Sequence, residues 1–305
     1  MFKKLHKKFH TFFELLREGK FLDIFARIIN TITFGAFNKW WRLHVYKRLE
    51  NQYSPYVNAY VIHRGGGTEL SKTGHDKIIW WLWLQGYENA PEICKACLKS
   101  WQKWYPDYKI NILDEKNIFD YISLPDYITE KYHAKKMIPA HYADIIRTQL
   151  LYTHGGIWSD STIYVSGRHS KFEKMLSEHL AFFEPHSYDI FVGATYFIVS
   201  DKNSPSMKLA RDLQFDYWKN NNRAAHYFFI DMCLKMSKYK FPDEWQNMPL
   251  YPDQLVAELA KHMYEPYSPD LMKQFTDASD FHKLTYKLSQ TPSPNSIYRY
   301  IVDNA

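Results

Sequence analysis

The sequence has little of what marks secreted or membrane-spanning proteins. Its three cysteines, Cys94, Cys97 and Cys233, cannot form a closed set of disulfides. Cys94 and Cys97 make a C-x-x-C pair in a helical pattern, and no second pair or histidine cluster follows, so we expect reduced, half-buried helix residues. No run of about 18 uncharged apolar residues predicts a membrane span, and the amino terminus lacks a signal peptide's apolar core and cleavage site. These absences predict a cytoplasmic protein in a reducing compartment.

The motifs of several enzyme classes are also absent. The sequence has no G-x-S-x-G nucleophile elbow, no H-E-x-x-H zinc motif and no Walker motif. Gly65, Gly66 and Gly67 lie in a predicted loop over residues 63–76, but no strand pattern precedes them and no Gly-Lys-Ser/Thr follows. The three glycines therefore do not indicate a phosphate-binding loop.

The composition is that of a folded protein rich in aromatic residues. Of the 305 residues, 46% are hydrophobic and 24% are charged, which is enough apolar material for one large domain with appendages. The 20 Phe, 24 Tyr and 10 Trp indicate either an aromatic core or a groove lined with rings that suits sugars and nucleobases. Composition alone favours the aromatic core.

Positive charge is concentrated in the amino-terminal segment. Residues 1–50 hold eleven Lys/Arg and four Asp/Glu, a net of +7, whereas the remaining 255 residues sum to −1. Two helical apolar stripes run through this segment, formed by Phe2, Leu5, Phe9, Phe12 and Leu16, and by Phe21, Phe25, Ile28 and Ile32. Basic amphipathic helices with aromatic residues suit an anionic membrane surface, and the alternative is an arm packed on the protein's own body or on a second subunit. We predict an arm and linker over residues 1–76, a catalytic domain over 77–305, and no nucleic-acid partner.

The pattern after residue 77 is that of an α/β domain. The apolar run 78–84 predicts a buried strand, 91–105 a helix and 108–113 a second strand. This β-α-β unit implies parallel strands with a right-handed crossover. The further expected elements are helices at 139–154, 204–218, 224–236 and 252–264, and strands at 157–165, near 182 and at 191–199.

The most informative stretch reads A-D-I-I-R-T-Q-L-L-Y-T-H-G-G-I-W-S-D-S-T-I-Y-V. Asp144 and Arg147 are three residues apart and share one face of a helix that is otherwise apolar. The helix stops at two glycines, and a strand then carries Asp160 to the sheet edge where α/β proteins bind ligands. The carboxylate of Asp160 and the hydroxyls of Ser161 and Thr162 are hard oxygen ligands that suit Mg²⁺ or Mn²⁺ holding a diphosphate. The arrangement as a whole indicates a ligand site, although Asp144 and Arg147 alone would indicate an intrahelical ion pair.

This stretch resembles the donor-binding signature of the capsular polysaccharide synthesis glycosyltransferases. These are related to the fungal initiating mannosyltransferases and, more distantly, to the glucosylating clostridial toxins. The shared pattern is a helix with Asp-x-x-Arg, then Gly-Gly, then a strand that ends in a short acidic motif. The resemblance runs over about residues 77–287 and implies a GT-A fold, a Rossmann-like α/β sandwich that takes a nucleotide sugar. It also implies retention of the anomeric configuration.

The resemblance assigns roles residue by residue. Asp144 and Arg147 match the Asp and Arg that hold the donor sugar, and with Asp160 they are the catalytic candidates. Asp160 matches the first Asp of the Asp-x-Asp motif, which binds the ribose and the metal. Trp83, in L-W-L-Q-G, resembles the aromatic residue that stacks on uracil, a contact worth about 1–3 kcal/mol. Thr162 stands where the toxins and mannosyltransferases have the second Asp. A hydroxyl is a poorer, neutral ligand, so another residue completes the metal site or the diphosphate itself holds the metal.

Residues outside this signature complete the predicted site. The segment F-H-K-L-T-Y-K resembles the family's closing motif and makes His282 and Lys287 candidates for the diphosphate. His282 is expected to be a metal ligand or, alternatively, a structural histidine. We expect Lys287 to act electrostatically, because a positioned cation stabilises the negative charge that develops on the leaving diphosphate. Ser161 is a further substrate-binding candidate, and Asp231 either faces the acceptor or is an ordinary surface or capping carboxylate.

The implied function is transfer of a hexose, galactose or glucose, from a UDP-linked donor. The acceptor would be a lipid-linked oligosaccharide in the synthesis of a bacterial capsular or surface polysaccharide. A lipid-linked acceptor accounts for a basic arm that binds the inner face of the plasma membrane. The alternatives are a toxin-like transferase that acts on a protein, and a non-catalytic protein that binds polysaccharide or membrane.

Overall fold

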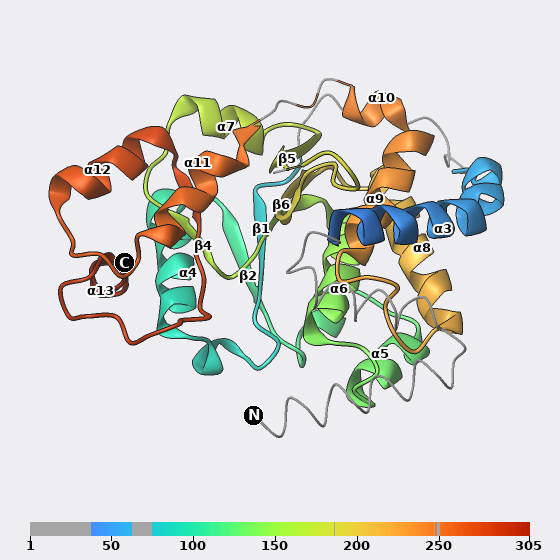
Figure 1. The fold of residues 1–305 in the computed structure, drawn as a ribbon, viewed down its shortest axis with the longest axis horizontal. Coiled ribbons are helices and arrows are strands. Elements are labelled where there is room, and N and C mark those ends of the chain that lie inside the picture. The colour runs from blue at the N-terminus through green and yellow to red at the C-terminus, as the bar shows by residue number, and fades with distance from the viewer. Residues whose placement is uncertain (1–37, 63–74, 186, 247, 249–250) are drawn as a thin grey trace. The chain divides into compact units, whose positions relative to one another are not determined.

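The computed structural model describes residues 38–62, 75–185, 187–246, 248 and 251–305 (Figure 1). The chain forms two compact units with their boundary between Ser54 and Pro55. The helices are α3 (Asn38–Ala59), α4 (Glu92–Trp104), α5 (Asp126–His133), α6 (Pro139–His154), α7 (Ser170–Leu176), α8 (Pro205–Asn220), α9 (Phe229–Lys240), α10 (Pro242–Trp245), α11 (Asp253–Glu258), α12 (Pro269–Ala278) and α13 (Ile297–Asn304). The strands are β1 (Ile78–Leu82), β2 (Lys109–Leu113), β3 (Gly156–Ser159), β4 (Ile163–Val165), β5 (Leu180–Glu184), β6 (Ala194–Ser200), β7 (Tyr251–Pro252) and β8 (Phe281–Lys283).

The first unit is described only from Asn38 onward, where the chain enters α3. Trp40 and Trp41 lie on the first turns of this helix, with ring centroids 5.3 and 5.5 Å from that of His44. The two predicted apolar stripes at 2–32, and most of the predicted loop at 63–76, lie outside the described residues. The division between 76 and 77 and the role of the arm therefore stay predictions. Within the described residues, no helix is both long and apolar enough to cross a membrane.

A six-stranded sheet in the order β2-β1-β3-β6-β5-β7 forms the centre of the second unit. Strands β2, β1 and β3 are parallel, and β6 runs antiparallel to β3. A two-stranded sheet of β4 and β8 stands beside it. The predicted α/β class is confirmed, and the sheet agrees with the Rossmann-like, GT-A type. The predicted β-α-β unit is β1-α4-β2, whose crossover helix forms as expected because its apolar residues recur at helical spacing.

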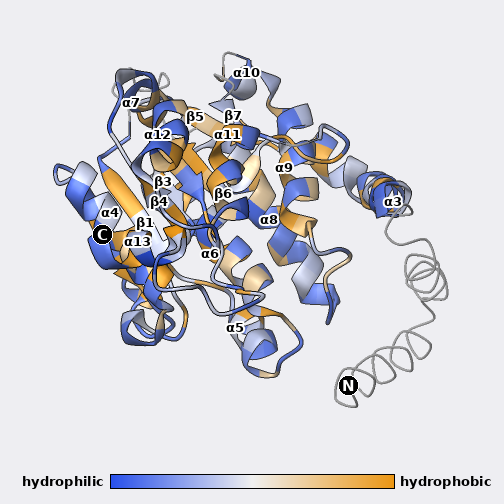
Figure 2. Cartoon of the chain, turned by 60° about the vertical axis from the view of Figure 1, so that its left-hand side comes forward, coloured by the Kyte–Doolittle hydropathy of each residue, from blue (hydrophilic) through white to orange (hydrophobic). Residues whose placement is uncertain are grey.

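Helices cover both faces of the sheet. Alternate residues of β1 serve the two sides: Ile79 and Trp81 pack with α4, while Trp80 donates a hydrogen bond from Nε1 to the Gly155 carbonyl at the end of α6 (2.8 Å). Figure 2 shows hydrophobic residues concentrated on the strands, whereas the helices alternate between hydrophobic and hydrophilic residues. Cys94 and Cys97 are unpaired, as expected, but they are fully buried in the α4 layer instead of half-buried.

Helix α6 begins and ends where the sequence predicts. Pro139 occupies the first turn, where its missing N–H is not needed. Gly155 and Gly156 follow the helix with φ of 70° and 97°, a region that disfavours other residues. A Cβ on Gly156 would also lie 2.7 Å from the Ile78 carbonyl oxygen of β1. The Gly-Gly pair therefore allows the chain to turn directly from α6 into β3, against β1.

Several predicted elements differ from those observed. The predicted strand at 157–165 is two strands, β3 and β4, in different sheets, because residues 160–162 form a polar turn. The helix predicted at 224–236 is α9 and begins at Phe229, and the one predicted at 252–264 is the shorter α11 followed by a 3₁₀ turn. Short elements such as α5, α7 and β8 were not predicted, because they carry too few residues for a periodic pattern.

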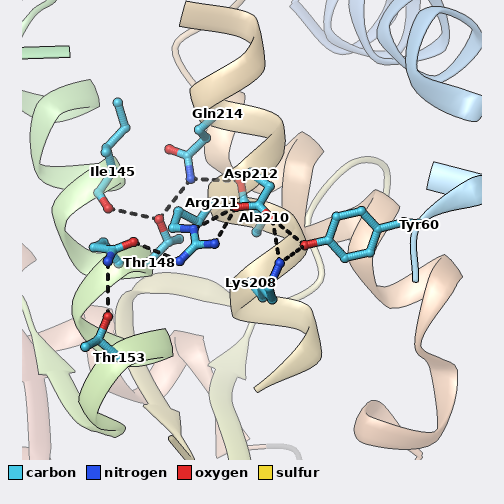
Figure 3. A network of polar contacts seen from close by, with 10 residues as sticks. Tyr60, Ile145, Thr148, Thr153, Lys208, Ala210, Arg211, Asp212 and Gln214 are labelled. Atoms are coloured by element: carbon cyan, nitrogen blue, oxygen red, sulfur yellow. Dashed lines mark hydrogen bonds and ion pairs between the residues drawn. The ribbon is translucent and has the colours of Figure 1, made fainter. Parts of the chain in front are cut away.

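A polar network joins α8 to α6 and to the segment that follows α3 (Figure 3). Tyr60 donates to the carboxylate of Asp212, and Lys208 Nζ contacts both, at 2.9 Å from Tyr60 Oη and 3.0 Å from Asp212 Oδ2. Deeper in, Gln214 Nε2 donates to Thr148 Oγ1 (3.1 Å). Because Thr148 lies one residue after Arg147, this network supports the part of α6 that carries the predicted site.

Candidate active site

The predicted site lies at a topological switch point of the sheet, where successive connections lead to strands on opposite sides of β1. From β1 the chain crosses to β2 on one side, and from β2 it crosses back to β3 on the other side of β1. The carboxyl ends of β1 and β3 flank this switch point, and Trp83 and Asp160 are the next residues after those ends. A crevice at such a point is the usual place for ligands in open α/β sheets.

Arg147 connects α6 to the sheet at this crevice. Its Nη2 lies 3.2 Å from Asp144 Oδ1 and 3.5 Å from Asp160 Oδ1, and its Nη1 donates to the Thr195 carbonyl at the start of β6. Its guanidinium carbon lies 5.0 Å from the ring centroid of Trp158, a cation–π contact. Asp144 and Arg147 are both buried, so the pair is not a solvated helix face. The structure thus brings the three catalytic candidates together.

A tight turn presents Asp160 to the crevice. The Asp160 carbonyl accepts from Ile163 N (3.0 Å), which closes a turn between β3 and β4. Oδ1 of Asp160 accepts from Trp158 Nε1 (2.9 Å), and Oδ2 accepts from Lys283 Nζ (2.8 Å). Burial alone would raise the pKa of the Asp160 carboxyl, but Lys283 and Arg147 outweigh it and hold the pKa below its ordinary value. Asp160 is therefore ionised at neutral pH, with 28% of its side chain exposed.

Aromatic rings surround the charged group. Tyr196 lies under Lys283, with Nζ 5.2 Å from the ring centroid. Burial first, and then the carboxylates of Asp144 and Asp160, raise the pKa of Tyr227. The pKa of Tyr286 is raised by burial and then by Cys94 and Asp160. Both tyrosines therefore lie within electrostatic range of the site. Tyr227 and Tyr286 are 58% and 41% exposed, which places two phenols at its rim.

Trp83 and Ser161 extend the site at its β1 side. The indole of Trp83 packs edge-on against Tyr286, with ring centroids 5.2 Å apart. Burial raises the pKa of the Cys94 thiol to about 11, although a hydrogen bond to Ser161 opposes this. Cys94 is therefore a neutral thiol at physiological pH, next to the turn that carries Asp160 and Ser161.

The three predicted metal ligands do not form one set. His282 is fully buried, its Nε2 lies 2.8 Å from Ser166 Oγ, and burial lowers its pKa to about 3, so it is neutral at physiological pH. Thr162 Oγ1 accepts from Lys283 Nζ (2.6 Å) instead of facing an open position. Within the described part of the chain, no three or more His, Cys, Asp or Glu side chains are placed to hold a metal. The described side chains therefore do not form a complete site for a divalent cation by themselves, and the Mn²⁺ or Mg²⁺ cofactor stays a prediction.

The remaining predicted residues lie around the group. Lys287 is exposed in the segment after β8, with Nζ 5.8 Å from the ring centroid of Tyr286. Asp231 is buried in the first turn of α9, where a carboxylate also complements the helix dipole. Both placements leave their predicted roles untested.

Lys283 is the residue that sequence reasoning missed. It lies between the two residues selected from the F-H-K-L-T-Y-K motif, on a strand too short to recognise from its pattern. The register of β4 and β8 pairs Ile163 with Lys283 and Tyr164 with His282, so side-chain alternation sends Lys283 towards Asp160 and His282 away from it. The signal available in the sequence was the alternation of side chains along a strand. His282 and Lys283 are consecutive, so only one of the two can face the ligand.

Comparisons with known proteins agree with the resemblance in the sequence. The model of the capsular polysaccharide synthesis protein family matches residues 36–301. The chain is similar to the O-glycosyltransferase braB of Annulohypoxylon truncatum, with 27% identity over 95 residues that cover 28% of this chain and 23% of that protein. It is also similar to the O-glycosyltransferase PaGT of Phomopsis amygdali, with 25% identity over 108 residues, 32% of this chain and 27% of that protein. The chain thus spans about a quarter of the length of these curated relatives.

Among solved structures, the chain is similar to the PaToxG glycosyltransferase. The identity is 15% and the TM-score is 0.42, over 88% of this chain and 97% of that one.

Proposed function

The chain belongs to the capsular polysaccharide synthesis protein family, and on that premise we propose that it is a glycosyltransferase that uses a nucleotide diphosphate sugar. The donor is a UDP-hexose with galactose or glucose as its sugar. The acceptor is a lipid-linked oligosaccharide, and the protein works at the inner face of a bacterial plasma membrane. Transfer proceeds with retention of the anomeric configuration.

One observation carries the proposal. Two acids and two cations converge on the switch point of the sheet from α6, from the turn after β3 and from β8: Asp144, Asp160, Arg147 and Lys283. Exposed tyrosines and a tryptophan adjoin this group. Carboxylates that accept sugar hydroxyls, cations that meet phosphate and rings that stack on a base are the three kinds of group that a nucleotide sugar requires.

Each residue has a distinct task in this proposal. Trp83 stacks on the uracil, and Asp160 accepts hydrogen bonds from the ribose. Asp144 accepts from hydroxyls of the sugar, while Arg147 fixes the orientation of both carboxylates. When the bond between the sugar and the diphosphate breaks, the electron pair goes to the phosphate oxygen, and Lys283 and Lys287 stabilise that charge.

Replacing Trp83 with Ala tests the task assigned to the base. We expect the dissociation constant for UDP to rise about tenfold, because stacking on an aromatic ring is worth about 1–3 kcal/mol. Titration calorimetry with UDP measures the effect, and Trp83→Phe serves as the matched control that keeps a ring. Unchanged UDP affinity in Trp83→Ala would place the base elsewhere.

The amino-terminal arm supplies a second test. We expect the quadruple change of Lys3, Lys4, Lys7 and Lys8 to Gln to weaken binding to anionic vesicles, since each basic residue near such a surface is worth about 1 kcal/mol. Vesicle sedimentation at increasing salt measures it, because screening should weaken only the charge-dependent binding. A short soluble acceptor should be used equally well by both proteins. If the variant binds vesicles normally but melts at a lower temperature or changes its oligomeric state, the arm packs on the protein itself.

A further inference from the structure

Lys283 occupies the place between the two oxygen ligands that the sequence assigns to a metal. Its Nζ lies 2.8 Å from Asp160 Oδ2 and 2.6 Å from Thr162 Oγ1. A divalent cation bound by the same two oxygens would lie against this ammonium group, and like charges at such a distance repel. The site therefore offers one carboxylate and one neutral hydroxyl, and a cation of the chain already engages both.

We propose that Lys283 takes the role of the divalent cation and binds the diphosphate of the donor, so that donor binding and turnover need no metal. The inference rests on the proposed nucleotide-sugar function. It extends that function by making the cation that neutralises the diphosphate a residue of the chain.

The geometry of β8 fixes the ammonium group in position. Lys283 ends a strand whose partner β4 begins one residue after Thr162, so the two side chains start close together. The ring of Tyr196 lies 5.2 Å from Nζ on another side. A lysine ammonium has three donors, and the two hydrogen bonds to Asp160 and Thr162 use two of them. With 25% of the side chain exposed, the third donor is available to a phosphate oxygen.

The charges of the site agree with this role. Lys283 offsets the charge of Asp160, which would otherwise repel a diphosphate bound beside it, and Arg147 offsets that of Asp144. Lys287, four residues after Lys283, is exposed and brings a further cation. Thr162, which stands in place of a second carboxylate, is consistent with this role. Two carboxylates carry two negative charges, which a divalent cation would balance, whereas the single charge of Asp160 is balanced by one ammonium group.

Binding of UDP and of uridine by Lys283→Met in a chelating buffer tests the contact with phosphate. We expect UDP affinity to fall about 10- to 100-fold, the effect of losing one charge-assisted hydrogen bond, while uridine affinity stays within about twofold. A purely structural role would weaken both ligands together. Lys283→Arg keeps a cation and should retain most of the UDP affinity. Lys273→Met on α12, an exposed lysine paired with Asp277, is the matched control that should change neither.

Turnover of UDP-hexose by the full chain, with EDTA and then with added Mn²⁺ or Mg²⁺, tests the absence of a metal requirement. We expect wild-type hydrolysis to change by no more than about twofold between these conditions, and Lys283→Met to lose about 100-fold in both. Wild-type activity that disappears in EDTA and returns with Mn²⁺ would overturn the inference while sustaining the proposed function. A folded chain that neither binds UDP nor hydrolyses any donor, with or without metal, would overturn both.

Discussion

Asp160→Asn is expected to lower both transfer and donor hydrolysis by at least about 100-fold, the cost of removing one preorganised charge from an active site. The amide keeps the size of the side chain and an oxygen that accepts from Trp158 Nε1. It removes the negative charge that holds Lys283 and lies 3.5 Å from Arg147. Steady-state kinetics with a UDP-hexose and a soluble acceptor measure the effect.

The fold should survive this change. The side chain of Lys283 is 25% exposed, so its ammonium group keeps access to water, and the buried Arg147 retains Asp144 at 3.2 Å. Circular dichroism melting provides the check, with Asp277→Asn on the exposed face of α12 as the matched control. An Asp160→Asn enzyme with near wild-type activity would remove Asp160 from the site, and one that fails to fold would give it a structural role instead.

Arg147→Ala is expected to lose about 10²- to 10³-fold in kcat/KM for transfer, and more than Arg147→Lys, while both retain UDP binding. The guanidinium contacts Asp144, Asp160 and the Thr195 carbonyl at once through its two terminal nitrogens. An ammonium group is a point charge without this planar fork, so lysine restores the charge but not the three contacts.

Kinetics and UDP titration on the same preparations separate the roles of sugar and base. Arg147→Lys, which keeps a cation between Asp144 and Asp160, provides a folded variant if loss of the buried cation destabilises Arg147→Ala. If Arg147→Ala loses UDP binding while Trp83→Ala keeps it, the two roles are exchanged.

The sequence predicted those parts of the fold whose local signals agree with their surroundings. Helix α6 is bounded by Pro139 and Gly155, and it was predicted to the residue because both ends have their own chemistry. Strand β1 was predicted from a continuous apolar run, since a strand covered on both faces has no polar alternation. The strand predicted over 157–165 was wrong in one respect, because a polar turn centred on residues 160–162 separates β3 from β4.

The sequence predicts the part of the candidate site that lies within one continuous segment of the chain. Asp144, Arg147 and Asp160 lie within 17 positions of the chain, and their meeting follows from a helix, a glycine turn and a strand. Lys283 is 123 positions beyond Asp160, and only the pairing of β4 with β8 brings the two together. Such a long-range pairing is not encoded in the spacing of residues, so the F-H-K-L-T-Y-K motif points to His282 and Lys287 and does not single out Lys283.

The central claim is that the purified full chain uses a nucleotide sugar, and release of free nucleotide from UDP- and GDP-hexoses tests it most directly. The wild-type chain should hydrolyse at least one UDP-hexose, and Asp160→Asn, assayed beside it, should release nucleotide at least about 100-fold more slowly. A folded wild-type chain that releases no nucleotide from any donor, and whose melting temperature none of them raises, would contradict the claim.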